Sequence, residues 1–197
     1  MLDCGSVTPR LRGLWLRVRP RLVKVAVVVA IAAPASATVL LPADLPTVVR
    51  EAGVIVHGRV IDVRSALVGP RRTIETFVTL DVLEPLKGAP GATVMFRVPN
   101  GQVGRYRRVL VGAPEFQDGD EVVVFLRGSA PAIPVLLGLS QGLYRVARDG
   151  EARPMVAPPP VTARDGAGRI VRGDPGRRPV PLAAFVREVK GIAERAR

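Results

Sequence analysis

The chain has almost no cysteine and histidine, the residues used for disulfides, thiol chemistry and zinc binding. Its 197 residues include one cysteine, Cys4, and one histidine, His57. A disulfide needs two cysteines and a zinc site needs several Cys or His ligands, so this chain can assemble neither by itself. We therefore expect packing alone to stabilise the fold, and we expect no cofactor. His57 is expected to be a surface or groove residue.

The single histidine also bears on a serine-hydrolase motif. Residues 138–142, Gly-Leu-Ser-Gln-Gly, match the G-x-S-x-G pattern, in which Ser140 would be the nucleophile. That motif requires a strand, a strained turn and a helix, with the catalytic histidine later in the chain. Here residues 143–146 have the pattern of a strand, and His57 lies upstream. We predict that residues 138–142 form a turn that needs two glycines, that the protein has no catalytic residue, and that it is not an enzyme. A hydrolase that uses Ser140 is the last of the three hypotheses for its function.

A cluster of carboxylates offers oxygen ligands without the spacing of a metal loop. Glu115, Asp118, Asp120 and Glu121 lie close together in the sequence. A calcium-binding loop places its oxygen ligands at regular alternate positions, which this cluster does not do. We expect a solvated turn and no metal site.

Long apolar runs are scarce, and the one that stands out lies near the N-terminus. Basic residues between Arg10 and Lys24 precede the apolar residues 25–33 and the sequence Ala35-Ser36-Ala37. A basic region, a short apolar region and small residues at the third and first positions before the cut are the features of an export signal. We predict cleavage after Ala37, which leaves Thr38 as the first residue of an exported protein, periplasmic or extracellular.

An uncleaved membrane anchor is the alternative, because apolar residues resume at positions 39–41. A membrane span needs about 20 consecutive apolar residues, and Pro34, Ser36 and Pro42 interrupt this run. We favour cleavage. No later segment is long or apolar enough to span a bilayer.

The formal net charge of +12 is unevenly distributed. Residues 1–37 hold six basic and one acidic residue, a net +5; residues 38–149 hold 13 and 11, a net +2; residues 150–197 hold 10 and 5, a net +5. In an exported protein, a basic excess favours an anionic surface of the cell envelope over nucleic acid as the binding partner. The simpler explanation is that the charge only keeps the protein soluble.

The pattern of residues divides the chain into four regions. Residues 1–37 are the predicted signal, 38–149 a β-barrel domain, 150–181 a connector or loose hairpin rich in Pro, Gly and Arg, and 182–197 a helix. In the last region Leu182, Phe185, Val186, Val189 and Ile192 recur at helical spacing. We expect this apolar face to dock on the barrel; the alternative is a helix lying on a membrane.

The barrel domain has one helix signal followed by strand signals. Asp44 can cap a short helix over residues 45–52, with Pro46 in its first turn and Gly53 at its end. Alternating or β-branched runs predict strands over residues 54–63, 73–83, 92–98, 106–111, 121–126, 135–139 and 143–146. Residues 121–126 are apolar on both faces, which suits a central strand.

Short connections between these strands predict a largely antiparallel sheet. Gly58 and Gly138 fit the bends of a small barrel. The fold class we predict is mostly β, with a small antiparallel, OB-like β-barrel of about six strands, a short N-terminal helix and a C-terminal amphipathic helix.

One basic stretch of the mature chain contains an aromatic residue. The residues Arg105, Tyr106, Arg107 and Arg108 are consecutive, and Arg97 lies nearby in the sequence. Arginines beside an aromatic ring suit stacking combined with contact to an anionic group. We take these five residues as the candidate site for a ligand or partner; the alternative is an ordinary exposed strand.

The order of these pieces resembles a known group of sequences. The segments that carry the likeness are VIVHGRV (54–60), TFVTLDVLEPLKG (76–88), GAPEF (112–116), GDEVVVFL (119–126) and QGLYRV (141–146). Over about residues 44–148 they resemble a group of uncharacterised bacterial exported proteins. More distantly, the chain is similar to netrin-like modules and tissue inhibitors of metalloproteinases, which implies an OB-type barrel with a terminal helix.

The inhibitory mechanism of that family does not transfer with the likeness. It depends on an N-terminal cysteine that chelates the metal of the protease, whereas the predicted first residue here is Thr38 and no cysteine follows it. The leading hypothesis is an exported, non-enzymatic binding module for a protein or an anionic envelope component, with no nucleic acid as partner. The alternative is a peptidase inhibitor that inserts the turns at residues 99–101 and 112–120.

Overall fold

A computed structural model describes residues 44–128, 131–159, 162–164, 170–172 and 178–196. The predicted signal at residues 1–37 lies outside these ranges. Within the described ranges, the compact unit Val39–Arg197 contains two α-helices and a set of mostly antiparallel strands.

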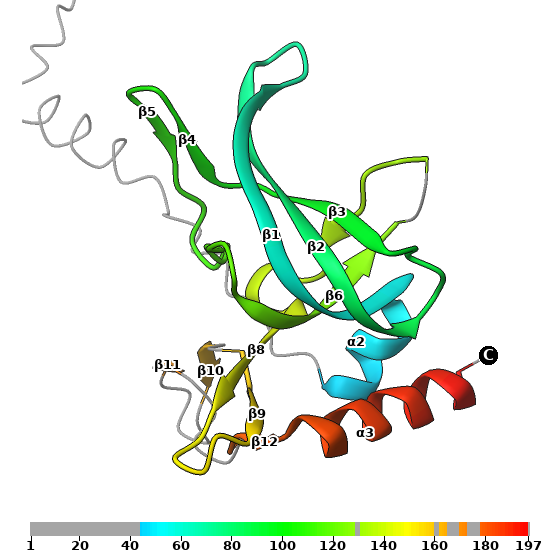
Figure 1. Cartoon of the computed structure of the whole chain (residues 1–197). Coiled ribbons are helices and arrows are strands. Elements are labelled where there is room, and N and C mark those ends of the chain that lie inside the picture. Colours follow the sequence, from blue (N-terminus) through cyan, green and yellow to red (C-terminus); the bar gives the residue numbers. More distant parts are fainter. Residues whose placement is uncertain (1–43, 129–130, 160–161, 165–169, 173–177, 197) are drawn as a thin grey trace, which may run out of the picture. The chain divides into compact units, whose positions relative to one another are not determined.

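Five strands close into a barrel (Figure 1). They are β1 (Val54–Val68), β2 (Thr73–Lys87), β3 (Thr93–Val98), β7 (Val135–Leu136) and β6 (Glu121–Arg127), and β6 pairs again with β1. All neighbours are antiparallel except β3 and β7, which run parallel. The predicted fold class is confirmed: a mostly β protein with a small closed barrel, a short N-terminal helix and a C-terminal helix.

Further strands extend the sheet or form small hairpins. The strands β8 (Leu143–Arg148), β9 (Pro154–Ala157) and β12 (Val180–Pro181) continue the sheet outward from β6. Two hairpins stand apart from this sheet, β4 (Gly101–Val103) with β5 (Tyr106–Arg108) and β10 (Thr162–Arg164) with β11 (Ile170–Arg172). The region predicted as a connector or loose hairpin therefore holds β9 to β12.

The central position of β6 explains its apolar sequence. Residues 122–126 are all buried, because side chains that alternate along the strand enter two different hydrophobic clusters. Val122 and Val124 point into the barrel with Phe96 and Leu80, whereas Val123 and Phe125 face the helices. The expectation of a central strand is confirmed.

Both helices cover the outer cluster. In α2 (Leu45–Glu51), the Asp44 side chain accepts a hydrogen bond of 2.8 Å from the Thr47 N–H, as expected for an N-cap. The buried side of α3 (Leu182–Arg195) includes Phe185 and Val189, which confirms that this helix docks on the sheet. Neither helix of the described ranges has the length and apolarity to cross a bilayer.

The β1–β2 hairpin extends beyond the barrel. Pairing between β1 and β6 ends at Arg59 and Glu121, whereas pairing between β1 and β2 continues to Val68 and Thr73. A register shift between His57 and Gly58 marks the bend expected at this glycine, where an added Cβ would lie 2.6 Å from the Asp81 carbonyl oxygen. The outer half of the hairpin therefore projects from one end of the barrel (Figure 1).

Three sequence-based expectations are wrong in part. The strand expected over residues 106–111 ends at Arg108, and the strand expected over residues 135–139 ends at Leu136, because Gly138 and Leu139 adopt positive φ angles in a turn. His57 is buried, at 8% exposure, and not a surface residue. Its neighbour on the same face, Ile55, belongs to the cluster under the helices, so this part of β1 is covered on both sides.

Candidate functional site

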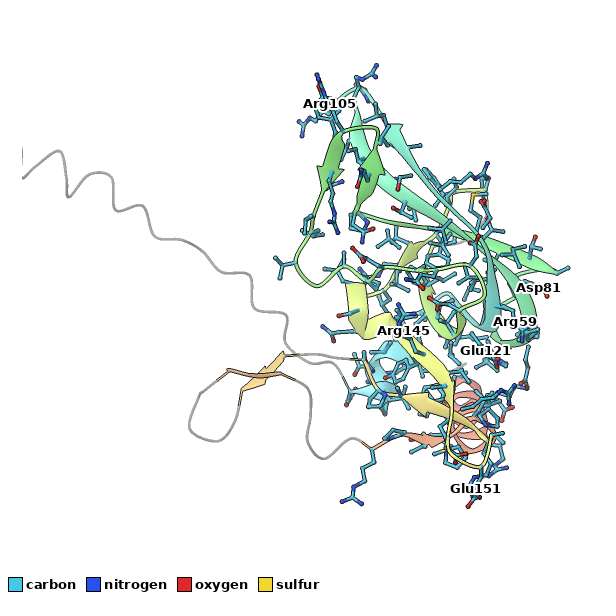
Figure 2. The ribbon with its side chains drawn as sticks, turned by 60° about the vertical axis from the view of Figure 1, so that its left-hand side comes forward. Arg59, Asp81, Arg105, Glu121, Arg145 and Glu151 are labelled. Carbon is cyan, nitrogen blue, oxygen red and sulfur yellow. The ribbon has the colours of Figure 1, made fainter. Side chains whose placement is uncertain are left out.

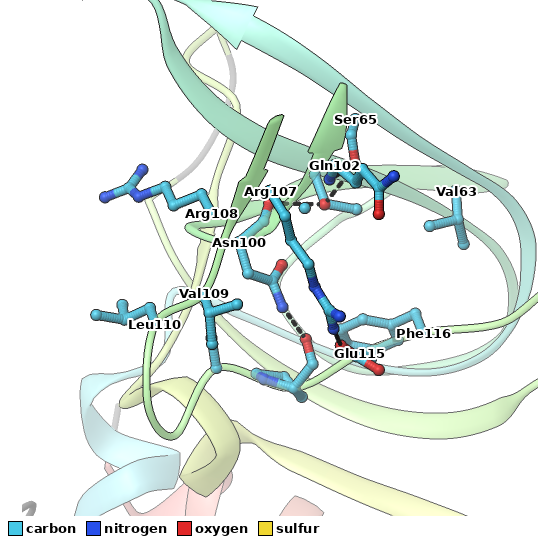
Figure 3. A pocket seen from close by; sticks show the side chains of 14 residues that line it. Val63, Ser65, Asn100, Gln102, Arg107, Arg108, Val109, Leu110, Glu115 and Phe116 are labelled. Carbon is cyan, nitrogen blue, oxygen red and sulfur yellow. Dashed lines mark hydrogen bonds and ion pairs between the residues drawn. The ribbon is translucent and has the colours of Figure 1, made fainter. Parts of the chain in front are cut away.

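Two hairpins and one loop surround a cavity at the end of the barrel. The β1–β2 and β4–β5 hairpins both project from this end (Figures 1 and 2). The cavity beside them has a volume of about 380 Å³ (Figure 3). Its walls come from Val63 and Ser65 of β1, Thr76 of β2, residues 100–102, residues 107–110 and residues 113–116.

Close packing fixes the β4–β5 hairpin against β1 and β2. Gly101 has a φ of 134°, and a Cβ there would lie 2.5 Å from Oγ1 of Thr76. The Thr76 hydroxyl donates to the Asn100 carbonyl at 2.8 Å and lies 3.0 Å from Oγ of Ser65. The Gln102 N–H donates to the same Ser65 oxygen at 3.3 Å. A side chain at position 101 would therefore separate the hairpin from the barrel.

The loop after β5 is held in place from both sides of the cavity. Asn100 donates from Nδ2 to the Pro114 carbonyl at 2.8 Å, and the Ser140 N–H donates to the Gly112 carbonyl at 3.0 Å. Arg145 donates to the Glu115 carbonyl. The loop between these supports exposes two apolar side chains, Val109 at 71% and Val111 at 90%.

Six arginines on the two projecting segments form what we name the basic face. Residues 63–74 and 99–114 contain no Asp or Glu. They contribute Arg64, Arg71, Arg72, Arg105, Arg107 and Arg108 to the basic face. Carboxylates occur only at the borders of these segments, where Asp62 pairs with Arg64 at 2.7 Å and Glu115 pairs with Arg107 at 2.9 Å.

The structure brings together four of the five residues predicted from the sequence. Arg105 and Tyr106 lie at the tip of the β4–β5 hairpin, with the guanidinium 5.1 Å from the ring centroid. Arg107 runs across the cavity toward Glu115 (Figure 3), and Arg108 donates to the Ile74 carbonyl at 3.1 Å. Of the five, only Arg107 and Arg108 line the cavity. Arg97 lies apart from the hairpin, on β3, where it pairs with Glu75 at 3.1 Å.

The ion pair between Arg107 and Glu115 is weak enough that an anionic ligand can replace Glu115. The Arg107 and Glu115 side chains are 60% and 77% exposed, and an ion pair this open to water contributes at most about 1 kcal/mol. A phosphate or carboxylate of a ligand can replace Glu115 beside Arg107 at little cost. Asn100 and Gln102 line the same cavity with amide groups.

The other residues singled out in the sequence have structural partners. Ser140 lies in a 3₁₀ turn, Leu139–Gly142, followed directly by β8, so the helix of a nucleophile elbow does not follow it. His57 contacts Glu121, with 2.9 Å between Nε2 and Oε1. Asp120 accepts from Arg145 at 2.6 Å. Within the described ranges, no three His, Cys, Asp or Glu residues are grouped so that they could hold a metal ion.

Sequence reasoning missed the contribution of the β1–β2 hairpin. Arg71 and Arg72 follow Gly69-Pro70 in its turn, far in sequence from residues 105–108. The available signal was the absence of carboxylates from two segments that contain six arginines. Comparison with models of protein families and with curated protein sequences finds no match for this chain.

Proposed function

We propose that this protein is an exported, non-enzymatic binding module that holds an anionic component of the cell envelope on its basic face. The observation that supports this proposal is the set of six arginines on two projecting segments, residues 63–74 and 99–114, that contain no Asp or Glu. Two of them, Arg107 and Arg108, line the cavity at the barrel end. Mouths of small barrels are common sites for ligands.

The charge distribution favours an anionic partner over a neutral one. Like charges brought together on one surface repel each other, and an anionic partner relieves that repulsion while it gains attraction from each guanidinium. Arginine also offers paired N–H donors that match phosphate and carboxylate oxygens. An acidic protein has the same chemistry, so its recovery is one outcome of the test below.

The test compares three arginines of the basic face with three elsewhere. Residues 38–197, immobilised, are incubated with an envelope extract divided into lipid, glycan and protein fractions. The variant R105A/R107A/R108A is compared with the wild type and with a control of equal charge, R50A/R187A/R195A, whose arginines lie on α2 and α3. A cooperative thermal unfolding transition in each of the three proteins would show that all of them are folded.

We expect the wild type and the control to retain an anionic component that elutes as salt rises, and the basic-face variant to lose it. Equal recovery by all three proteins contradicts the proposal. Recovery of an acidic protein instead of a glycan or lipid keeps the basic face as the site and changes the class of partner.

A second candidate, a peptidase inhibitor, is supported by the loop at residues 109–111. The loop exposes Val109 and Val111 while hydrogen bonds from Asn100, Ser140 and Arg145 fix its end. A rigid, exposed apolar loop suits insertion into the cleft of a peptidase because little ordering is required on binding. Of the turns expected to act as probes, residues 99–101 and 112–114 are bonded to each other through Asn100 and Pro114.

Inhibition is tested by adding residues 38–197 in excess to secreted metalloproteases. A fall in proteolysis that V111D abolishes and R187A retains supports this candidate. Unchanged proteolysis at stoichiometric excess contradicts it.

A further inference from the structure

The tips of the two projecting hairpins combine cationic and apolar side chains. At the β1–β2 tip, Arg71 and Arg72 follow Leu67, which is 41% exposed. At the β4–β5 tip, Arg105 adjoins Tyr106, which is 62% exposed. Large apolar side chains this exposed, next to charges of one sign, mark a surface that meets both an anionic and an apolar environment.

The arrangement of the hairpins lets both tips reach one surface. Figures 1 and 2 both show the two tips at the same end of the barrel, away from α2 and α3. In Figure 2, Arg105 lies at this end and Glu151, in the turn after β8, lies at the other. Pairing along β1 and β2 up to Val68 and Thr73 gives the longer hairpin a regular ladder that supports its tip.

We propose that the two hairpin tips dock on the surface of an anionic lipid bilayer. Arg71, Arg72 and Arg105 contact lipid phosphates, while Leu67 and Tyr106 enter the interface between headgroups and acyl chains. This proposal rests on the proposed function and names the component that is bound. The apolar side chains favour a bilayer over a soluble polyanion, because a soluble polyanion would leave Leu67 and Tyr106 in water.

Arg105 and Tyr106 also suit an interface individually. The guanidinium lies over the ring and donates to the Tyr106 hydroxyl at 2.9 Å, so the charge and the polar end of the tyrosine are held together. Tyrosine is enriched at membrane interfaces because its ring is apolar and its hydroxyl is polar. The pair can place the ring among acyl chains while the charge stays at the phosphates.

Vesicle flotation tests whether the arginines at the hairpin tips bind an anionic bilayer. Residues 38–197 contain the whole described fold and omit the apolar stretch at 25–33, which would bind vesicles by itself. We expect binding to vesicles of phosphatidylglycerol and phosphatidylethanolamine, and little binding to phosphatidylcholine. Each arginine near an anionic surface contributes about fivefold in affinity, so R71Q/R72Q should bind about 25-fold more weakly, and the charge-matched control R187Q/R195Q should bind like the wild type.

The fluorescence of a single tryptophan tests whether the side chain at position 106 enters the bilayer interface. The only tryptophan of the chain, Trp15, is absent from residues 38–197, so Y106W supplies a unique fluorophore at the tip. We expect its emission to shift to shorter wavelength when anionic vesicles are added. The control L83W places the fluorophore on β2 beside Glu84, which pairs with Lys190 of α3, and its emission should not change.

Three results would overturn the proposal. They are equal binding to neutral and anionic vesicles, unchanged binding by R71Q/R72Q, and binding of soluble polyphosphate without any emission shift of Y106W on anionic vesicles. The last result, together with a partner lost by R105A/R107A/R108A, leaves the proposed function intact with a soluble anion as ligand. Failure of that variant to lose any partner removes the proposed function itself.

Discussion

At the scale of single residues, Gly101 is the position on which the candidate site depends most. The close approach of β4 to Ser65 and Thr76, and a φ of 134°, both require glycine. We predict that G101A lowers the free energy of unfolding by about 2–4 kcal/mol, because a strained backbone and a steric overlap each cost about 1–3 kcal/mol. Denaturation in urea measures the change.

Gly104, in the turn between β4 and β5, provides the control for this prediction. Its φ is 58°, but no atom lies within 4 Å of an added Cβ. G104A should therefore cost only about 1 kcal/mol, from the left-handed backbone alone. If the two variants are equally stable, the hairpin is not held as the structure shows.

Hydrogen bonds in the turn after β8 lower the pKa of Asp149. A hydrogen bond from the Arg153 N–H is the largest cause that lowers the pKa of Asp149, with further bonds from the Arg153 side chain and the Glu151 N–H; partial desolvation opposes them. The ionised form is thus favoured in the β8–β9 turn. Its stabilising effect is present above the pKa of the unfolded chain and is lost as pH falls through the lower, folded pKa.

Titration of the Asp149 carboxyl carbon by NMR checks this direction. We expect its midpoint to lie below that of aspartate in an unfolded peptide, and we expect D149N to remove the accompanying pH dependence of the Glu151 and Arg153 amide shifts. A midpoint at or above the peptide value contradicts the hydrogen-bonded turn.

At the scale of elements, patterns of apolar residues predicted the strands and helices well. The alternation in residues 73–83 appears as burial of Ile74, Thr76, Val78 and Leu80, and the two-sided apolar run of residues 121–126 became the most buried strand. Burial drives both patterns, so both are visible in the sequence. The end of β5 was predicted wrongly because residues 109–111 are apolar yet exposed.

The docking of α3 gives the third prediction. Phe185 packs against Tyr144, with 4.7 Å between ring centroids, and Tyr144 contacts Phe125 of the barrel at 5.4 Å. F185A should lower the free energy of unfolding by about 3–5 kcal/mol, since it removes a buried aromatic side chain. The exposed neighbour Arg187 is the control, and R187A should change stability by no more than about 0.5 kcal/mol. A cost below 1 kcal/mol for F185A would mean that α3 does not stabilise the barrel.

At the scale of the whole molecule, the candidate site was predictable only in part. Arg105, Tyr106, Arg107 and Arg108 are adjacent in the sequence, so their cluster was visible. Arg71 and Arg72 lie at the same end of the barrel only because β1 and β2 continue past the barrel, beside β4 and β5. The lack of carboxylates in both segments is visible in the sequence, but their placement at one end of the barrel is a property of the fold.

The last prediction concerns cleavage of the N-terminal segment, which would change the net charge of the molecule. Cleavage after Ala37 removes +5 of the +12 charge and leaves +7, of which residues 38–149 carry +2 and residues 150–197 carry +5. We predict that the exported protein begins at Thr38, because Ala35 and Ala37 are the small residues that signal peptidase requires. Intact mass measurement of protein recovered from the periplasm or medium identifies the N-terminus.

The variant A37R tests the same prediction from the opposite direction. A large charged residue directly before the cut should block cleavage, so the uncleaved chain should remain with the membrane fraction through its apolar residues 25–33. The control A33L keeps the apolar region and both small residues and should be cleaved like the wild type. Recovery of wild-type protein that retains residues 1–37 would instead support the membrane anchor. The hairpin tips would then contact the bilayer to which the protein is already tethered.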